Sequence, residues 1–280
     1  MQGPQVILVK QCRAAIQILN PGCLWNLRLR EIATVNKIHL DWHLENGVAS
    51  LGNLILLLLA LFSFPFVLHY TNALAVAGVD PASPQHKAAV IRFCVVVTAY
   101  LWVCFSICLG GIGTSSRATF SEVIGKAWHG WPDAFRDLGI SVLVLAAMFT
   151  IGQLSDRLLP SSQQSEAVFR SMVPQKLEEG VAFLIVALSA GFVEEFVFRG
   201  YLQRQFESLF GNRLLASVLQ IALFTAGHLY QGVERLIPVL LIGTLLTLVA
   251  IYRKSLIPGM IAHGVGDSLP AITFFVQRFS

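Results

Sequence analysis

Long uncharged runs of apolar residues, separated by short polar connections, make up most of this chain. They cover residues 51–68, 93–112, 138–154, 180–193, 214–227, 236–252 and 255–276, the last of which is interrupted by His263 and Asp267. A helix needs about 20 apolar residues to cross the hydrocarbon core of a bilayer, and most of these runs approach or exceed that length. The pattern predicts an all-α, polytopic membrane helical bundle with about seven transmembrane helices.

The composition agrees with a membrane protein. Hydrophobic residues make up 55% of the 280 residues and charged residues 13%, whereas soluble domains are typically about 25% charged. The net charge of +4 does not indicate nucleic-acid binding, because Lys and Arg in the connections of a membrane protein report its orientation. Most Lys and Arg fall on the inner side if the N-terminus is inside, so we expect a cytoplasmic N-terminus.

Three segments differ in character. Residues 1–46 mix polar and apolar residues and carry several Lys and Arg. We expect them to form a disordered or amphipathic cytoplasmic extension. Residues 47–176 contain three featureless spans and a polar linker, and residues 177–280 contain the unusual ionisable residues. The five cysteines show neither metal-ligand spacing nor a disulfide framework.

The first unusual group is Glu194-Glu195 with Arg199, at the end of an apolar run. Charged residues are costly in such surroundings and indicate a functional site in a membrane protein. At i and i+4 on a helix, Glu195 and Arg199 can pair, whereas Glu194 points about 100° away and is left free. A packing network of ions is the alternative interpretation.

Helical spacing brings His228 to the level of Glu194. Gly211-Asn212 predicts a turn between two helices, with Glu194 17 residues before Gly211 and His228 17 residues after it. If Arg204 and Lys254 mark the inner interface, Glu194 before Arg204 and His263 after Lys254 both lie about 14–15 Å deep. We therefore expect a water-accessible site in the inner half of the membrane, beside a helix that ends near Gln231-Gly232.

His263 and Asp267 are also at i and i+4, on one face of an apolar helix. Two carboxylates and two imidazoles suit water activation and oxyanion stabilisation in hydrolysis. The same groups are chemically able to bind a divalent metal such as zinc. The His-Glu-x-x-His pattern of helical zinc proteases and the Gly-x-Ser-x-Gly nucleophile elbow do not occur.

Three motifs in order resemble the CAAX protease and bacteriocin-processing family, also called the Abi family. They are Glu194-Glu195-x-x-x-Arg199, followed by Gly200, then Phe224-x-x-x-His228, then His263-x-x-x-Asp267. The resemblance extends over about residues 177–276. It implies an intramembrane endopeptidase in a bacterial inner membrane, with a peptide or membrane-tethered protein as substrate.

The resemblance also implies residue roles. Glu194 and His228 would activate water near the cytoplasmic side, His263 and Asp267 would stabilise the oxyanion, and Glu195 and Arg199 would support them. Relatives often have Asn at the position of Asp267; an ionised Asp cannot donate to an oxyanion, so Asp267 must be protonated or must orient His263. The motifs leave open a metal-dependent or a metal-free mechanism. A non-enzymatic scaffold or bacteriocin-immunity protein, and more remotely a transporter, are the alternatives.

Overall fold

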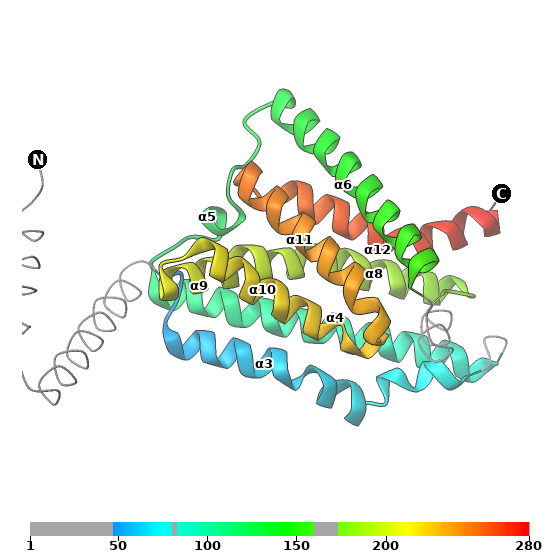
Figure 1. The fold of residues 1–280 in the computed structure, drawn as a ribbon. Helices are drawn as coiled ribbons and strands as arrows, with labels where there is room; N and C mark the ends of the chain where they lie inside the picture. Colours follow the sequence, from blue (N-terminus) through cyan, green and yellow to red (C-terminus); the bar gives the residue numbers. More distant parts are fainter. Residues whose placement is uncertain (1–46, 80–82, 160–172, 280) are drawn as a thin grey trace, which may run out of the picture. The chain divides into compact units, whose positions relative to one another are not determined.

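The computed structural model describes residues 47–79, 83–159 and 173–279, so the predicted extension at residues 1–46 lies outside the described part. Each of the seven apolar runs is helical, which confirms the predicted all-α fold (Figure 1). The helices are α3 (Leu51–Tyr70), α4 (Pro84–Ser115), α6 (Trp131–Leu158), α8 (Leu177–Glu194), α10 (Arg213–Gly227), α11 (Leu236–Arg253) and α12 (Ile257–Phe279).

Shorter elements connect these helices. They are the 3₁₀ helix η2 (Ala73–Gly78), α5 (Phe120–Ile124), the π-helix η3 (Glu195–Leu202), α9 (Gln203–Phe210) and the 3₁₀ turns η4 (Leu229–Gln231) and η5 (Val233–Arg235). The isolated bridge between Gly125 and Ser255 is the only β-pairing within the described ranges.

The chain is an integral membrane protein with five to seven spans. Five helices are long and apolar enough to cross a membrane, one of them the continuous segment Leu177–Phe210 that joins α8, η3 and α9. α10 is a shorter apolar helix of 15 residues. α12 has 23 residues but includes His263, Asp267 and Pro270, and it is not among the five.

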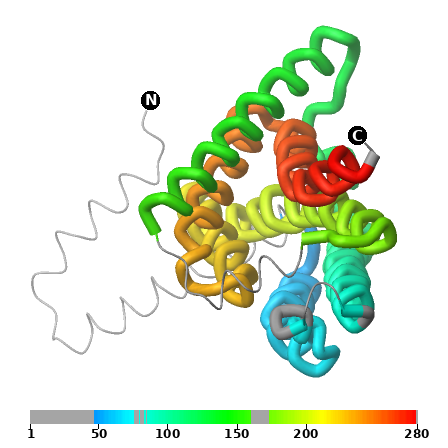
Figure 2. Tube along the Cα trace, turned by 90° about the vertical axis from the view of Figure 1, so that its right-hand side faces the viewer, coloured from blue at the N-terminus to red at the C-terminus, as the bar shows by residue number. Residues whose placement is uncertain are grey.

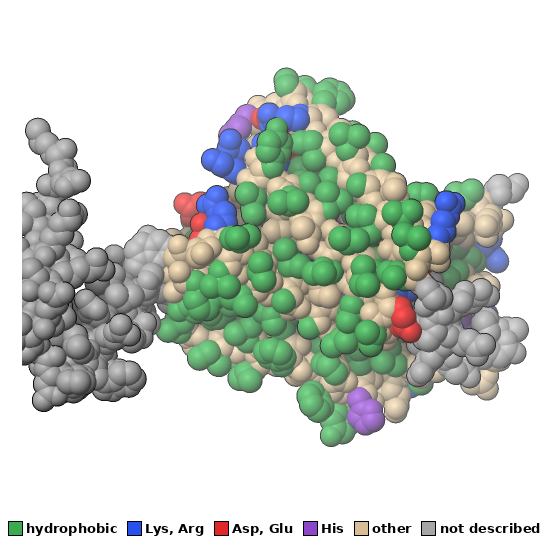
Figure 3. Space-filling model, viewed as in Figure 1, with side chains coloured by type: hydrophobic (Ala, Val, Ile, Leu, Met, Phe, Trp, Pro, Cys, Tyr) green, Lys and Arg blue, Asp and Glu red, His purple; other side chains and the backbone are tan. Residues whose placement is uncertain are grey.

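The surface has the character expected of a lipid-exposed protein. Large apolar side chains such as Phe66, Leu143 and Leu214 are 65%, 72% and 74% exposed. Figure 3 shows a face covered mainly by hydrophobic side chains, with the charged side chains at its edges. In water so much exposed apolar area would be unfavourable, whereas in a bilayer it faces lipid tails.

Helix α8 packs between α4 and α12, as the view along the bundle in Figure 2 shows. The contact with α12 depends on small residues: a Cβ atom on Gly191 would overlap the backbone of Gly264. Small residues allow membrane helices to approach closely when no hydrophobic effect drives their association. This close approach brings His263 of α12 next to Glu194 and Glu195.

The predicted helical hairpin is present. Gly211 ends α9 with a φ of 62°, a conformation that suits glycine, and the Asn212 side chain caps α10 by accepting the backbone N–H of Leu215 at 3.0 Å. α10 ends at Gly227, four residues before the expected end at Gln231-Gly232. The chain continues in two 3₁₀ turns separated by Gly232, whose φ is 106°.

The connection between α4 and α6 is joined to the turn between α11 and α12. Gly125 and Ser255 form the isolated bridge, with the N–H of Lys126 donating to the carbonyl of Lys254 at 2.8 Å. If the predicted spans alternate from a cytoplasmic N-terminus, both connections fall on the inner side of the membrane, and the structure places them at the same end of the bundle.

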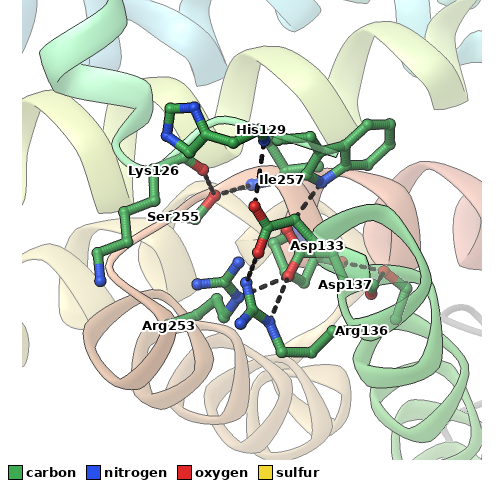
Figure 4. Close-up of polar contacts among 11 residues, drawn as sticks. Lys126, His129, Asp133, Arg136, Asp137, Arg253, Ser255 and Ile257 are labelled. Atoms are coloured by element: carbon green, nitrogen blue, oxygen red, sulfur yellow. Dashed lines mark hydrogen bonds and ion pairs between the residues drawn. The ribbon is translucent and has the colours of Figure 1, made fainter. Parts of the chain in front are cut away.

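Asp137 of α6 reinforces this junction (Figure 4). Its carboxylate is fully buried and accepts the Nε–H of Arg253 at 2.5 Å and the Nε1–H of Trp128 at 2.9 Å. The hydroxyl of Ser141, one turn further along α6, donates to the carbonyl of Pro258 at 3.1 Å. These contacts hold the start of α12, and therefore the segment that leads to His263.

Candidate active site

Glu195 and Arg199 form a buried ion pair at the base of the site. Nη1 of Arg199 lies 3.1 Å from Oε1 of Glu195, and both side chains are fully buried. Nη2 of Arg199 donates to the carbonyl of Gly243 on α11 at 3.2 Å, and the guanidinium lies 4.1 Å from the ring centroid of Phe224 on α10. This pair therefore links η3 to two other helices.

The backbone of this pair is a π-helix rather than the regular α-helix assumed for the i and i+4 argument. All eight residues of η3 are buried. π-helical turns are rare and occur frequently at functional sites. The expected contact between Glu195 and Arg199 is nevertheless made.

Glu195 also holds His263, a contact that sequence analysis did not predict. Oε1 of Glu195 lies 3.0 Å from Nδ1 of His263, across 68 residues of sequence. The carboxylate acts as an acceptor, so Nδ1 is the donor in this hydrogen bond. No local spacing could have indicated this pair, because it depends on the packing of α8 against α12.

The other ring nitrogen of His263 faces two acids. Nε2 lies 3.4 Å from Oδ2 of Asp267, its i+4 neighbour, and 3.8 Å from Oε2 of Glu194. The side chain of Asp267 is 44% exposed and that of Glu194 is 16% exposed. Oε2 of Glu194 is buried and makes no hydrogen bond to the described residues.

His228 stands at the C-terminal end of α10. Its Nδ1 lies 2.8 Å from the carbonyl oxygen of Phe224, and its ring contacts Phe224 and Tyr230, with centroids 4.7 and 6.3 Å away. A carbonyl oxygen only accepts, so Nδ1 carries the proton and Nε2 of the neutral ring has a free lone pair. His228 and Glu194 share a cavity, whereas the nearest ionisable partner of Glu194 is His263.

One cavity of about 360 Å³ brings the four candidate residues together. Glu194, His228, His263 and Asp267 all line it, although they come from three separate helices or helix ends. A second cavity of about 230 Å³ also reaches Glu194 and His228, and its lining is mainly apolar side chains of α3, α4, η3 and α10.

The larger cavity lies away from the turn that contains Lys254. Its lining includes Phe93 near the start of α4, Gly152 near the end of α6, Arg235 before α11 and Pro270 in the second half of α12. These positions lie in the half of the bundle that faces away from Lys254. With a cytoplasmic N-terminus this is the outer half, so the expectation of an opening in the inner half does not fit that orientation.

Within the described residues, no three His, Cys, Asp or Glu side chains are gathered as a metal ion requires. Zinc sites generally use three or four such ligands, so no step below is assigned to a metal.

Fold and site together define an integral membrane protein with buried Glu and His side chains around an internal cavity. Residues 176–269 match the family model described as type II CAAX prenyl endopeptidase Rce1-like, so the chain contains a domain of this peptidase family. The resemblance stated from the three motifs is thereby confirmed. No curated protein and no solved structure matches the chain.

Proposed function

We propose that this protein is an intramembrane endopeptidase that hydrolyses a peptide bond of a peptide or membrane-tethered protein. The observation that carries this proposal is the shared cavity of Glu194, His228, His263 and Asp267. The family is a peptidase family, which supports a peptide substrate. We further propose a bacterial inner membrane as its location, with the N-terminus in the cytoplasm.

In the proposed mechanism, Glu194 and His228 activate the attacking water. The water lies between the free Oε2 of Glu194 and the scissile carbonyl, with Nε2 of His228 available to accept a hydrogen bond. Its oxygen bonds to the carbonyl carbon while its proton passes to the carboxylate. The C–N bond then breaks, and the proton is delivered to the leaving amine.

His263 and Asp267 are proposed to stabilise the tetrahedral oxyanion. Glu195 accepts from Nδ1 of His263, so the ring is held in one orientation with Nε2 facing the cavity. A proton on Nε2 gives a donor and a positive charge for the oxyanion. Asp267 is proposed to orient His263, a role in which an ionised Asp does not have to donate a hydrogen bond.

The side of the membrane on which cleavage occurs follows from the orientation. Cleavage near the cytoplasmic side was expected from the shared depth of Glu194, His228 and His263, but the cavity extends toward the Arg235 end. The excess of Lys and Arg that supports a cytoplasmic N-terminus comes from residues 1–46, since the connections at the two ends of the bundle contain nearly equal numbers. Direct access from the cytoplasm therefore requires the opposite orientation.

The test is turnover of a prenylated CAAX-type peptide by the purified full chain. We expect Glu194→Gln and His228→Ala each to lower kcat by about 10²–10⁴-fold, the usual contribution of general acid–base catalysis. Glu178→Gln is the matched control, because Glu178 is an exposed acid at the other end of α8. A metal chelator should leave turnover unchanged, because no three candidate metal ligands are gathered among the described residues.

Wild-type turnover in both site variants would contradict the assignment. In that case, complementation of a deletion strain by a variant lacking all four site residues would favour the non-enzymatic scaffold or immunity role.

A further inference from the structure

The larger cavity has an uneven charge distribution. Glu194 and Asp267 place two carboxyl groups in its lining, beside the two histidines. Arg235 is the only Lys or Arg among the described residues that line it. A peptide bound here therefore meets two acids and two histidines at the candidate catalytic residues, and a guanidinium at Arg235.

One contact of Arg235 is an ion pair with an exposed acid on α6. Its Nη1 lies 2.8 Å from Oδ1 of Asp156 on α6, and the side chain of Arg235 is 20% exposed while that of Asp156 is 52% exposed. An ion pair whose carboxylate is mostly solvated contributes little to stability. A second carboxylate can therefore replace Asp156 at small cost.

We propose that Arg235 is the subsite for a carboxylate of the substrate, with Asp156 as its resting partner. The inference rests on the peptidase function proposed above. A guanidinium binds carboxylate through two parallel hydrogen bonds, which fixes position as well as charge. Glu194 and Asp267 disfavour a carboxylate at their own end of the cavity, so the anionic part of the peptide lies at Arg235 and the scissile bond lies at Glu194.

The neighbours of Arg235 support a polar subsite. Tyr230 and Gln231 line the same cavity, and Nε2 of Gln231 donates to the hydroxyl of Tyr230 at 3.0 Å. This edge of the cavity therefore offers hydrogen-bonding groups, in contrast to the apolar lining provided by Phe183, Val186 and Ile242.

The competing explanation is an ion pair that only ties α6 to the start of α11. The two explanations predict different signs for the effects of removing Arg235 and of removing Asp156. A structural pair is lost equally when either partner is removed, so Arg235→Gln and Asp156→Asn would weaken the protein in the same way. A carboxylate subsite gives opposite effects, because loss of Asp156 removes a competitor for the guanidinium.

The experiment compares a prenylated CAAX-type peptide ending in a free carboxylate with the same peptide as a C-terminal amide. For the acid, Arg235→Gln should raise KM about tenfold, as expected for loss of one charge-assisted interaction, with kcat little changed. Asp156→Asn should lower KM for the acid. Neither variant should change KM for the amide, and Arg157→Gln, an exposed cation beside Asp156, should match the wild type for both peptides.

An amidated peptide ending in glutamate distinguishes a side-chain carboxylate from a terminal one. Equal KM values for acid and amide in the wild type would overturn the assignment of the subsite. KM shifts of the same sign in Arg235→Gln and Asp156→Asn would also overturn it.

If the wild type cleaves none of these peptides, the peptidase proposal itself fails. The subsite is then judged by fluorescence anisotropy of the labelled peptides on the full-length chain: a preference for the acid that Arg235→Gln abolishes supports it, and the absence of a preference refutes it.

Discussion

Two adjacent acids have different surroundings at the residue scale. Glu195 is fully buried and contacts both Arg199 and His263 through Oε1, whereas the side chain of Glu194 is 16% exposed and lines the cavity. Burying ions is costly, and the guanidinium of Arg199 offsets the charge of Glu195. This ion pair thus supports the neighbouring acid, Glu194, which remains available for chemistry.

Removing the charge of Glu195 should lower both the stability of the protein and its peptide turnover. Glu195→Gln leaves Arg199 buried without its counter-ion, and breaking such a pair typically costs about 3–5 kcal/mol. We expect a lower free energy of unfolding, measured by thermal or SDS-induced unfolding of the detergent-purified chain.

Two further variants separate the effects of charge and of the His263 contact. Glu195→Gln combined with Arg199→Met should regain stability because the uncompensated charge is gone, but it should not regain turnover because His263 has lost its carboxylate acceptor. Glu207→Gln, in the more exposed pair with Arg213, is the control and should change little. A double variant as unstable as the single one would refute this account.

At the scale of elements, the site depends on how closely α8 and α12 approach. Gly191 and Gly264 let the two backbones come together, and the junction around Asp137 holds the start of α12. The i and i+4 contacts within η3 and α12 were predictable from spacing. The contact between Glu195 and His263 was not, because it depends on the distance and rotation between two helices.

A side chain at Gly191 should therefore impair catalysis. Gly191→Leu forces α8 away from Gly264 and displaces His263 from both glutamates, and a displacement of about 1 Å can lower turnover about 10²-fold. Peptide turnover and thermal unfolding should be measured together. Gly139→Leu on α6, where a Cβ meets nothing within 4 Å, is the control and should keep wild-type values. Normal turnover in Gly191→Leu would show that this close approach is not needed.

At the scale of the whole molecule, the predicted inner connections meet at one end of the bundle. Lys126 and Lys254 are joined by a backbone hydrogen bond, and Arg204 donates to the carbonyl of Glu122. At the other end of the described structure, Lys87 pairs with Glu178 and Arg235 with Asp156. The alternation of sides predicted from the sequence therefore agrees with the packing, whichever end faces the cytoplasm.

Cysteine labelling tests the orientation. In a chain without the five native cysteines, we expect Arg278→Cys to react with a membrane-impermeant maleimide in intact cells, and Lys126→Cys to react only after permeabilisation. These results would place the N-terminus in the cytoplasm, in line with the Lys and Arg of residues 1–46. The reverse pattern would place the Arg235 end of the cavity in the cytoplasm and would favour cleavage from that side.

The sequence by itself determined the membrane class, the seven helical runs, the hairpin turn at Gly211-Asn212 and the pairs within single helices. Each follows from local properties, namely apolar length, turn residues and helical spacing. The tertiary structure alone decided that Glu195 holds His263, that η3 is a π-helix, and that the cavity lies toward Arg235. These features depend on which helix faces meet and where gaps remain between them, and residues 68 positions apart in sequence, such as Glu195 and His263, come into contact only through that packing.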